Sequence, residues 1–294
     1  MARILAISSQ VARGAIGLSA IVPALQALGH EVVALPTILL SNHPGHTRFA
    51  GERVSTDLLA RMLDALEANG WLAEIEAVIT GYLPSAAHVA FARDAVLKLE
   101  RSRAGMLYVC DPVLGDVPKG IYIEQAAAEA IRDTLVPEAN ALTPNCFELG
   151  YLLGHDVPTS ELALRALEDF DRAALVIAKS LPGAAPDELL NVAAAGGVPL
   201  ALARVARREG AQHGTGDLMA AIVLAGLIEG REPVDVLALA TAVVDQVLAA
   251  SAGRDELDLA GLPRRLADVT PWPLETTEGA MTGTAWSIDP GLDP

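Results

Sequence analysis

Residues 3–35 read RILAISSQVARGAIGLSAIVPALQALGHEVVAL, and the order of patterns within this stretch decides the fold class. A compact apolar run over residues 4–7 is followed by a helical pattern over 16–28, which ends at Gly29. A second strand-like run over 31–35 comes next. Strand, helix and strand in this order predict a βαβ unit, in which the two strands lie parallel.

The same alternation continues through most of the chain. Residues 36–53 have no clear period and are predicted to form a long loop, and Ser55 is placed to cap a helix after it. The pattern predicts an α/β fold with three layers, a central and mostly parallel sheet covered by helices on both faces. We expect strands over 77–80, 106–110, 139–143 and 174–178, a hairpin over 189–194 and 200–205, and helices over 86–101, 123–135, 145–153, 162–170, 214–228 and 234–250.

The composition excludes several classes of protein. The 294 residues are 52% hydrophobic, which is enough for a core and excludes disorder over most of the chain. Acidic residues outnumber basic ones by 37 to 21, and the basic residues do not cluster, so a nucleic-acid partner is disfavoured. The longest apolar run, over 218–228, is too short to span a bilayer. Cys110 and Cys146 have no zinc spacing and suit a reducing compartment, so we expect a cytoplasmic protein.

Familiar phosphate and hydrolase motifs are missing. None of the three lysines, Lys98, Lys119 and Lys179, follows Gly and precedes Ser or Thr, so the sequence holds no P-loop. Residues 214–219 lack the third small residue of the dinucleotide fingerprint, and the sequence contains neither HExxH nor GxSxG. A Rossmann dehydrogenase is therefore disfavoured.

A glycine-rich turn opens the long apolar helix expected over 214–228. Gly214-Thr215-Gly216 would expose successive backbone N–H groups at the helix N-terminus, where an anion or a migrating phosphoryl group is stabilised. Asp217 follows at once. On spacing alone, the favoured interpretation of Asp217 is an ordinary acidic residue that caps a helix start.

Further polar residues stand where predicted strands end, the edge at which parallel sheets bind ligands. Asn145 and Glu148 share one helix face and could bind Mg²⁺, although a capping Asn beside a solvated Glu explains the spacing as well. Asp111 precedes a proline and could be a turn residue, and Lys179 could reach a phosphate or simply solvent. His43 and His46 in the long loop lack a third metal ligand.

Taken in order, these pieces resemble the pyridoxal kinase family of the ribokinase-like superfamily. The resemblance spans roughly residues 1–255, and we expect a single kinase domain over 1–270 with a peripheral or disordered tail over 271–294, in which Trp272 and Trp286 could dock. The residues that carry it are Ala6-Ile-Ser-Ser9-Gln-Val, Ser41-Asn-His43, Gly81-Tyr82, Cys110-Asp-Pro-Val-Leu-Gly115, Thr143-Pro-Asn-Cys-Phe-Glu148, Lys179 and Gly214-Thr-Gly-Asp217.

The resemblance implies a ribokinase-like fold and ATP-dependent phosphorylation of the 5′-hydroxyl of pyridoxal, with pyridoxine and pyridoxamine as related substrates, in a cytoplasmic homodimer. It also implies Mg²⁺ as cofactor and K⁺ as a further cation. Asp217 would be the catalytic base, with Gly214, Thr215 and Gly216 forming the anion hole. The remaining roles implied are substrate binding by Ser9, His43 and Tyr82, ATP binding by Asp111, Thr143, Glu148 and Lys179, and metal binding by Asp111, Asn145 and Glu148.

Two alternatives stay open. A hydroxymethylpyrimidine kinase has the same fold and a similar reaction, and a non-catalytic binder of pyridoxal phosphate or nucleotide would use similar residues. The chain also departs from the family pattern after Asn42-His43, where Thr, any residue and Tyr are common and Pro44-Gly45-His46 stand here.

Overall fold

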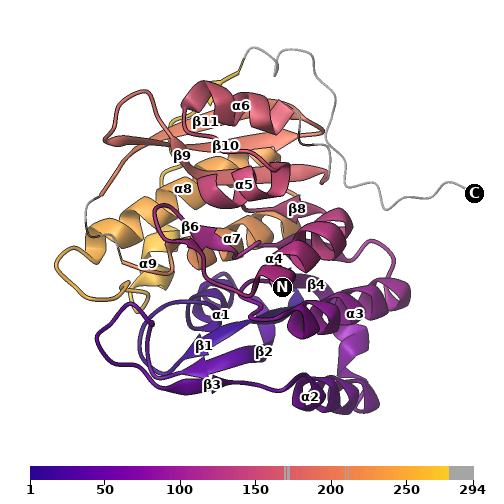
Figure 1. Ribbon diagram of the computed structural model, residues 1–294. Coiled ribbons are helices and arrows are strands. Elements are labelled where there is room, and N and C mark those ends of the chain that lie inside the picture. The colour runs from indigo at the N-terminus through magenta and orange to yellow at the C-terminus, as the bar shows by residue number, and fades with distance from the viewer. Residues whose placement is uncertain (169, 171–172, 209, 211, 278–294) are drawn as a thin grey trace, which may run out of the picture.

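A ten-stranded sheet runs through the centre of the molecule (Figure 1). The computed structural model describes residues 1–277, except 169, 171–172, 209 and 211. The strand order is β12-β11-β10-β9-β8-β5-β4-β1-β2-β3. The strands are β1 (Arg3–Val11), β2 (Glu31–Leu40), β3 (Gly51–Arg53), β4 (Ile75–Thr80), β5 (Leu107–Cys110), β8 (Ala141–Leu142), β9 (Leu175–Pro182), β10 (Glu188–Ala195), β11 (Val198–Ala206) and β12 (Glu275–Thr276).

The middle of this sheet is parallel and its edges are antiparallel. All pairs from β2 through β1, β4, β5 and β8 to β9 are parallel, whereas β3, β10, β11 and β12 pair antiparallel with their neighbours. A small hairpin of β6 (Gly115–Asp116) and β7 (Gly120–Ile121) stands apart from the main sheet. The carboxyl ends of the parallel strands therefore share one edge, as the sequence predicted.

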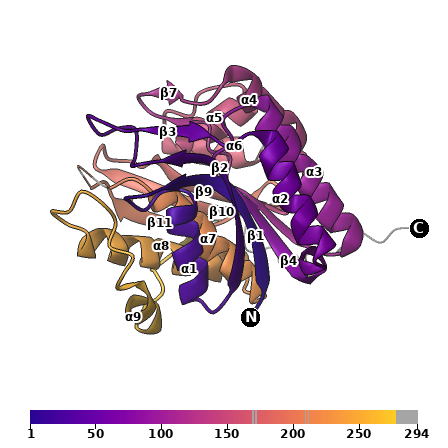
Figure 2. The same ribbon diagram turned by 90° about the horizontal axis from the view of Figure 1, so that it is seen from below.

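Helices cover both faces of the sheet (Figure 2). One layer holds α1 (Leu18–Ala27), α7 (Thr215–Ile228), α8 (Pro233–Ala250) and α9 (Leu262–Ala267), and the other holds α2 (Thr56–Ala68), α3 (Ala86–Ser102), α4 (Gln125–Ala130), α5 (Cys146–Leu153) and α6 (Ser160–Glu168). Short turns of helix occupy Trp71–Glu74, Ile131–Leu135 and Val136–Glu138. The three-layer α/β prediction is confirmed.

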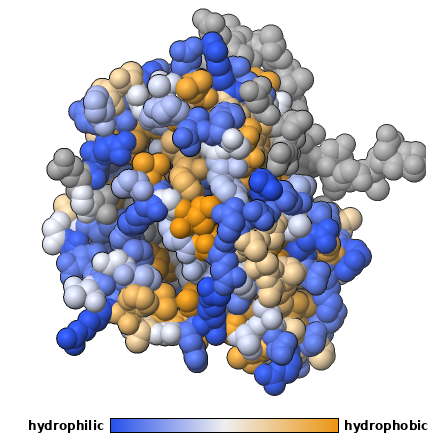
Figure 3. Space-filling model, viewed as in Figure 1, coloured by the Kyte–Doolittle hydropathy of each residue, from blue (hydrophilic) through white to orange (hydrophobic). Residues whose placement is uncertain are grey.

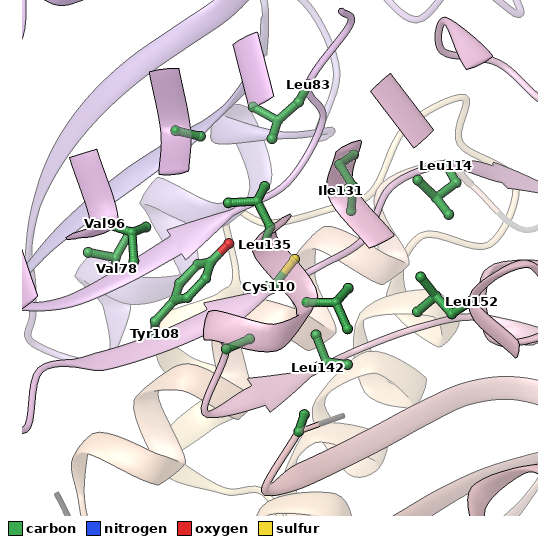
Figure 4. Packing of buried hydrophobic residues seen from close by; sticks show 14 of the residues in the cluster. Val78, Leu83, Val96, Tyr108, Cys110, Leu114, Ile131, Leu135, Leu142 and Leu152 are labelled. Atoms are coloured by element: carbon green, nitrogen blue, oxygen red, sulfur yellow. The ribbon is translucent and has the colours of Figure 1, made fainter. Parts of the chain in front are cut away.

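Two apolar cores lie between the sheet and these layers. Alternate side chains of β1 point to opposite faces, so Ile4 and Ala6 pack towards α1 and α7, while Leu5 and Ile7 pack towards α2 and α3. Figure 4 shows part of the second core, in which Tyr108 and Cys110 of β5 lie among aliphatic side chains. Each fully buried Leu or Ile stabilises the fold by about 1.5–3 kcal/mol relative to exposure.

Helix α7 is buried on every side. All ten residues from Leu218 to Leu227 are inaccessible or nearly so, and the helix packs against α1, α8 and the sheet. A helix that is apolar all round has to lie inside a protein or a membrane. Helix α8 also has the length and composition of a membrane span, but more than half of it is buried against α7, β10 and β11, as in a core helix.

Polar side chains cover most of the face in Figure 3, with apolar residues in small patches.

The predicted loop over 36–53 is wrong at both ends. Strand β1 continues through Val11, and its residues Ser8, Gln10 and Val11 pair with β2, which therefore extends to Leu40. Residues 51–53 then return as β3 beside Ile38–Leu40. Only residues 41–50 remain as a loop. The prediction failed because these strand segments are held by backbone hydrogen bonds, which the pattern of side chains does not show.

The chain after residue 270 returns to the sheet. The indole N–H of Trp272 donates to the Arg204 carbonyl oxygen at 3.0 Å, and β12 pairs with β11. The Arg204 guanidinium and the Glu275 carboxylate form two parallel hydrogen bonds of 2.6 and 3.1 Å. The docking expected for Trp272 is thus observed, while Trp286 lies outside the described residues.

Candidate functional site

Polar side chains gather at the carboxyl edge of the parallel strands. Asp111 directly follows β5, Thr143 follows β8, and Lys179 lies within β9. All three are buried, with relative exposures of 2%, 0% and 7%. Buried polar groups need partners, and here they find one another. The Lys179 Nζ atom lies 2.6 Å from Asp111 Oδ1, and the Thr143 hydroxyl donates to the same oxygen at 2.8 Å.

A bulge in β9 aims Lys179 at this cluster. Leu181 pairs with Leu190 and Ala178 pairs with Val192, so two residues of β9 oppose Asn191 alone. One of the two, Ser180, has a positive φ of 54°, and its N–H donates to Asn191 Oδ1 at 2.9 Å. Bulges redirect side chains next to functional sites. Lys179 was expected at a strand end, and the structure instead places it within β9 at this irregularity.

The charge of Lys179 is maintained by its neighbours. Burial on its own lowers the pKa of the lysine, but the carboxylates of Asp111 and Glu148 act in the opposite direction and raise it above its usual value. The ammonium therefore stays protonated inside the protein and provides a fixed positive charge at the site.

Asn145 and Glu148 form a capping box at the start of α5. The Glu148 N–H donates to Asn145 Oδ1 at 3.0 Å, and the Asn145 N–H donates to Glu148 Oε2 at 2.7 Å. The capping alternative is therefore correct for Asn145. It is wrong for Glu148, which is 2% exposed rather than solvated and also accepts from the Leu114 N–H. Burial raises the pKa of Glu148 to about 8, with Lys179 opposing and Asp111 adding to the shift.

Asp217 lies in the first turn of α7. Burial and the charge of Asp111 raise the pKa of this carboxyl to about 6, while a hydrogen bond from the Gly17 N–H lowers it in part. Gly214 precedes the helix with φ 97°, and a Cβ there would overlap the Ala15 carbonyl oxygen. The glycine turn can thus approach the loop after β1 so closely only because it lacks side chains.

The glycine turn also meets the lysine cluster. A Cβ on Gly216 would lie 3.0 Å from Lys179 Nζ, so the first turn of α7 faces that ammonium directly. The first N–H groups of a helix lack helical partners and carry partial positive charge. Backbone donors, an ammonium and the Asp217 carboxylate therefore share one small space.

The three residues expected to contact a substrate are linked to this site through neighbouring residues. Ser9 is 7% exposed and lies against Gly17, whose N–H holds Asp217. The N–H of Tyr82 donates to the Ser8 hydroxyl at 3.0 Å, and burial raises the pKa of the Tyr82 phenol. His43 in the loop 41–50 stacks on His213, the residue directly before Gly214, with ring centroids 3.7 Å apart.

Sequence reasoning missed several residues of this site. Gly17 gives its backbone N–H to Asp217, and the available signal was a glycine directly before helix α1. Asp116 is partly buried, and its Oδ1 has no hydrogen-bond partner in the described part of the chain. Burial and the charges of Glu148, Asp116, Asp111 and Asp217 raise the pKa of Tyr122, which places this phenol in the field of the acidic cluster.

One cavity opens beside the histidine pair, and a second lies next to the loop after β1. One of about 320 Å³ is lined by His43, His46, His213 and Arg254, among others. A second, of about 510 Å³, lies between residues 13–19 and the segment 254–260. The carboxylate of Glu256 joins their walls, since it pairs with His46 Nε2 at 3.2 Å and lies against Gly14.

The donor set fits a hard divalent cation that arrives with its own ligands. Within the described ranges no three His, Cys, Asp or Glu side chains converge closely enough to hold a metal alone. However, the charges of Asp111, Glu148 and Asp217 act on the buried ammonium of Lys179. Asp116 acts on Tyr122 together with these three carboxyl groups, and its Oδ1 has no partner among the described residues. Mg²⁺ typically keeps waters and phosphate oxygens and takes only one or two carboxylates from a protein.

Comparisons with known proteins agree with this geometry. Residues 13–257 match the family described as Phosphomethylpyrimidine kinase. The chain is 31% identical to "Pyridoxal kinase PdxY" of Corynebacterium diphtheriae over 83% of this chain and 88% of that protein. It is also 31% identical to "Pyridoxine/pyridoxal/pyridoxamine kinase" of Bordetella avium, over 87% and 88%. The solved structure of pyridoxal kinase from Leishmania donovani with ADP and pyridoxamine is 28% identical and superposes with a TM-score of 0.86, covering 94% of this chain and 98% of that one.

Proposed function

The chain belongs to the pyridoxal kinase group of the phosphomethylpyrimidine kinase family, and we propose that it transfers the γ-phosphoryl group of ATP to the 5′-hydroxyl of pyridoxal, giving pyridoxal 5′-phosphate. The observation that carries the reaction is the position of Asp217. A carboxylate with a pKa of about 6 stands at a glycine-lined helix mouth, beside the buried ammonium of Lys179.

Asp217 acts as the base in this proposal. A carboxylate that is largely ionised at neutral pH, yet more basic than usual, is suited to orient a primary alcohol and accept its proton. The hydrogen bond from the Gly17 N–H holds its position. The backbone N–H groups over Gly214, Thr215 and Gly216 then stabilise the charge of the migrating phosphoryl group, because they already point to where that charge develops.

The nucleotide phosphates lie on the side of Lys179 in this arrangement. The ammonium offsets phosphate charge, and Asp111 and Thr143 fix its position through the contacts described above. Mg²⁺ bound with ATP would neutralise further phosphate charge. Glu148 and Asp111 are the carboxylates we assign to it, with Asn145 serving mainly as the cap that orients Glu148. The free Asp116 oxygen is the donor we assign to a monovalent cation such as K⁺.

The pyridine ring occupies the side of Ser9, His43 and Tyr82. Relatives are named for pyridoxal alone or for all three vitamers, so we include pyridoxine and pyridoxamine as substrates. The two thiols, which form no disulfide, suit a cytoplasmic location. Half-exposed Leu39 and Phe49 lie near the β2–β3 edge of the sheet and support a homodimer through that edge.

Hydroxymethylpyrimidine kinase activity is the second candidate, favoured by the description of the matching family. The test is a steady-state assay with ATP and Mg²⁺ on purified protein, using pyridoxal, pyridoxine, pyridoxamine and hydroxymethylpyrimidine. We expect the highest kcat/KM with a B6 vitamer. Turnover of the pyrimidine alone would replace the proposed function, and binding of pyridoxal without turnover would point to a non-catalytic binder.

A further inference from the structure

The proposed function places His43 beside the pyridine ring but gives no role to its stacking on His213. The two rings lie with centroids 3.7 Å apart and planes at 21°, although 170 residues separate them in the chain. His43 belongs to the loop 41–50, whereas His213 belongs to the turn that leads into α7. The stack therefore joins the substrate side of the site to the phosphoryl side.

His213 has the firmer support of the two. The side chain of Gln212, directly before it, donates to the carbonyl oxygens of Ser251 and Arg254, each at 2.8 Å. Gly214, directly after it, is packed against Ala15. His213 is thus held from both sides and presents one ring face to His43, so the loop residue is the one that needs positioning.

Gly45 fixes the orientation of the His43 ring through a hydrogen bond. Its backbone N–H donates to His43 Nδ1 at 3.0 Å. A neutral imidazole has one donor and one acceptor nitrogen. Since Nδ1 accepts, the proton of the neutral ring is on Nε2, which is left to donate elsewhere. A Cβ at Gly45 would lie 2.8 Å from His43 Nδ1 and 3.5 Å from His213 Nε2, so any side chain there would press on both rings.

The surroundings keep this ring neutral. Burial, followed by the positive charges of His213, Lys119 and His46, lowers the pKa of His43 to about 4. Asp116 and Glu256 act in the opposite direction on His213, but its pKa is still lowered, with burial as the largest cause. A protonated His43 would also direct a second donor at the Gly45 N–H, which the observed geometry excludes.

We propose that His213 and Gly45 are positioning residues for substrate binding, which fix the ring plane of His43 and its Nε2–H tautomer so that this N–H donates to an oxygen of the pyridine substrate. This rests on the proposed function, in which His43 borders the pyridine ring. Neither residue is assigned to the phosphoryl group, so we expect the effect on substrate binding, with the nucleotide side unchanged.

The kinetic test compares His213→Ala, His213→Phe and Gly45→Ala in the full-length protein. Loss of a stacked ring is expected to raise KM for pyridoxal roughly three- to tenfold, with KM for ATP unchanged. His213→Phe retains a flat partner and should return KM to within about twofold of the wild type. Gly45→Ala should raise the same KM because its Cβ displaces His43. An unchanged KM for pyridoxal in His213→Ala, or no rescue by Phe, would overturn the proposal.

A second readout does not depend on turnover. The ¹⁵N NMR shifts of the His43 ring should show the Nε2–H tautomer in the wild type and a mixture of tautomers in His213→Ala and Gly45→Ala. His46→Asn breaks the pair with Glu256 in the same loop and should change neither the tautomer nor KM. An equal change in this variant would assign the effect to general loop order and overturn the role of the stack. If no vitamer is turned over, the proposed function fails while the tautomer measurement still decides the positioning.

Discussion

The Nζ atom of Lys179 lies 2.6 Å from Oδ1 of Asp111, and both side chains are more than 90% buried. These two buried charges are held by each other, by the Thr143 hydroxyl on the carboxylate and by the charge of Glu148 on the ammonium. Their pairing gives an acidic protein a fixed positive charge at the place where phosphates are expected, and it makes that charge depend on the residue that follows strand β5.

Breaking this pair from one side should destabilise the protein strongly. We expect Lys179→Met and Asp111→Asn each to lower the free energy of unfolding by about 3–5 kcal/mol, because each leaves one buried charge without its partner. The double variant should lose clearly less than the sum of the two. Urea unfolding of the four proteins measures this, and an additive double variant would contradict it.

Replacing Asp217 by Asn should separate catalysis from binding. The amide keeps the size of the carboxylate and can still accept from Gly17, but it cannot take a proton, so kcat should fall by about 10²–10⁴. Affinity for an ATP analogue, measured by calorimetry, should change little. Because the folded-state pKa is raised, ionised Asp217 is unfavourable for stability, and the variant should be at least as stable as the wild type at pH 8. Wild-type turnover would exclude Asp217 as the base.

The raised pKa of Asp217 predicts an acid limb in the activity profile. The base works only when ionised, so kcat/KM for pyridoxal should be flat above about pH 7 and fall tenfold per pH unit well below pH 6. A midpoint near 4, the value of an ordinary aspartate, would show that burial does not tune this group. The residual activity of Asp217→Asn should lack the limb, which serves as the control.

Glu148→Gln should raise the concentration of Mg²⁺ needed for half-maximal rate by about tenfold or more, because the amide cannot ionise to supply the carboxylate oxygen that Mg²⁺ prefers. The measurement is a Mg²⁺ titration of initial rate at fixed ATP. Glu129→Gln removes an exposed carboxylate of α4 and is the matched control, for which no change is expected. Identical titrations for both variants would remove Glu148 from the metal role.

Gly214 and Gly230 offer a test of the glycine turn. Both have positive φ, 97° and 71°, but a Cβ would overlap Ala15 only at Gly214, while nothing lies within 4 Å at Gly230. Gly230→Ala should cost roughly 1–2 kcal/mol of stability and keep full activity. Gly214→Ala should displace the turn and lower kcat by roughly 10². If both variants lowered kcat equally, backbone strain at a positive φ, and not the overlap with Ala15, would explain the loss of activity.

The elements of the fold could be predicted because their patterns are local. The helical spacing of Leu59 and Leu63, with Ser55 as the cap, gives α2, and the observed hydrogen bond from the Leu58 N–H to Ser55 confirms it. The continuation of β2 to Leu40 could not be predicted, since it depends on backbone pairing with a bulged β1. The register of a strand pair depends on both strands, so it cannot be predicted from the sequence of one strand alone.

The candidate site was predictable at the level of residue types and not at the level of contacts. Asp111, Glu148, Lys179 and Asp217 were identified by their place after strands or at a helix start, and the structure brings them together. The hydrogen bond from Gly17 to Asp217 is donated by a backbone N–H, so the pattern of side chains in the sequence could not indicate it. The stack of His43 on His213 depends on the path of two loops, so the sequence could suggest His43 as a substrate contact but not its pairing with His213.

The burial of α7 on all sides has a consequence for how the protein moves. Amide hydrogens in the middle of such a helix exchange with solvent mainly through global unfolding, whereas those of an exposed loop exchange through small local openings. Asp217 stands at the start of this buried helix, whereas His43 lies in the loop 41–50. We therefore expect the base to stay in place and any movement around the substrate to occur in the loop.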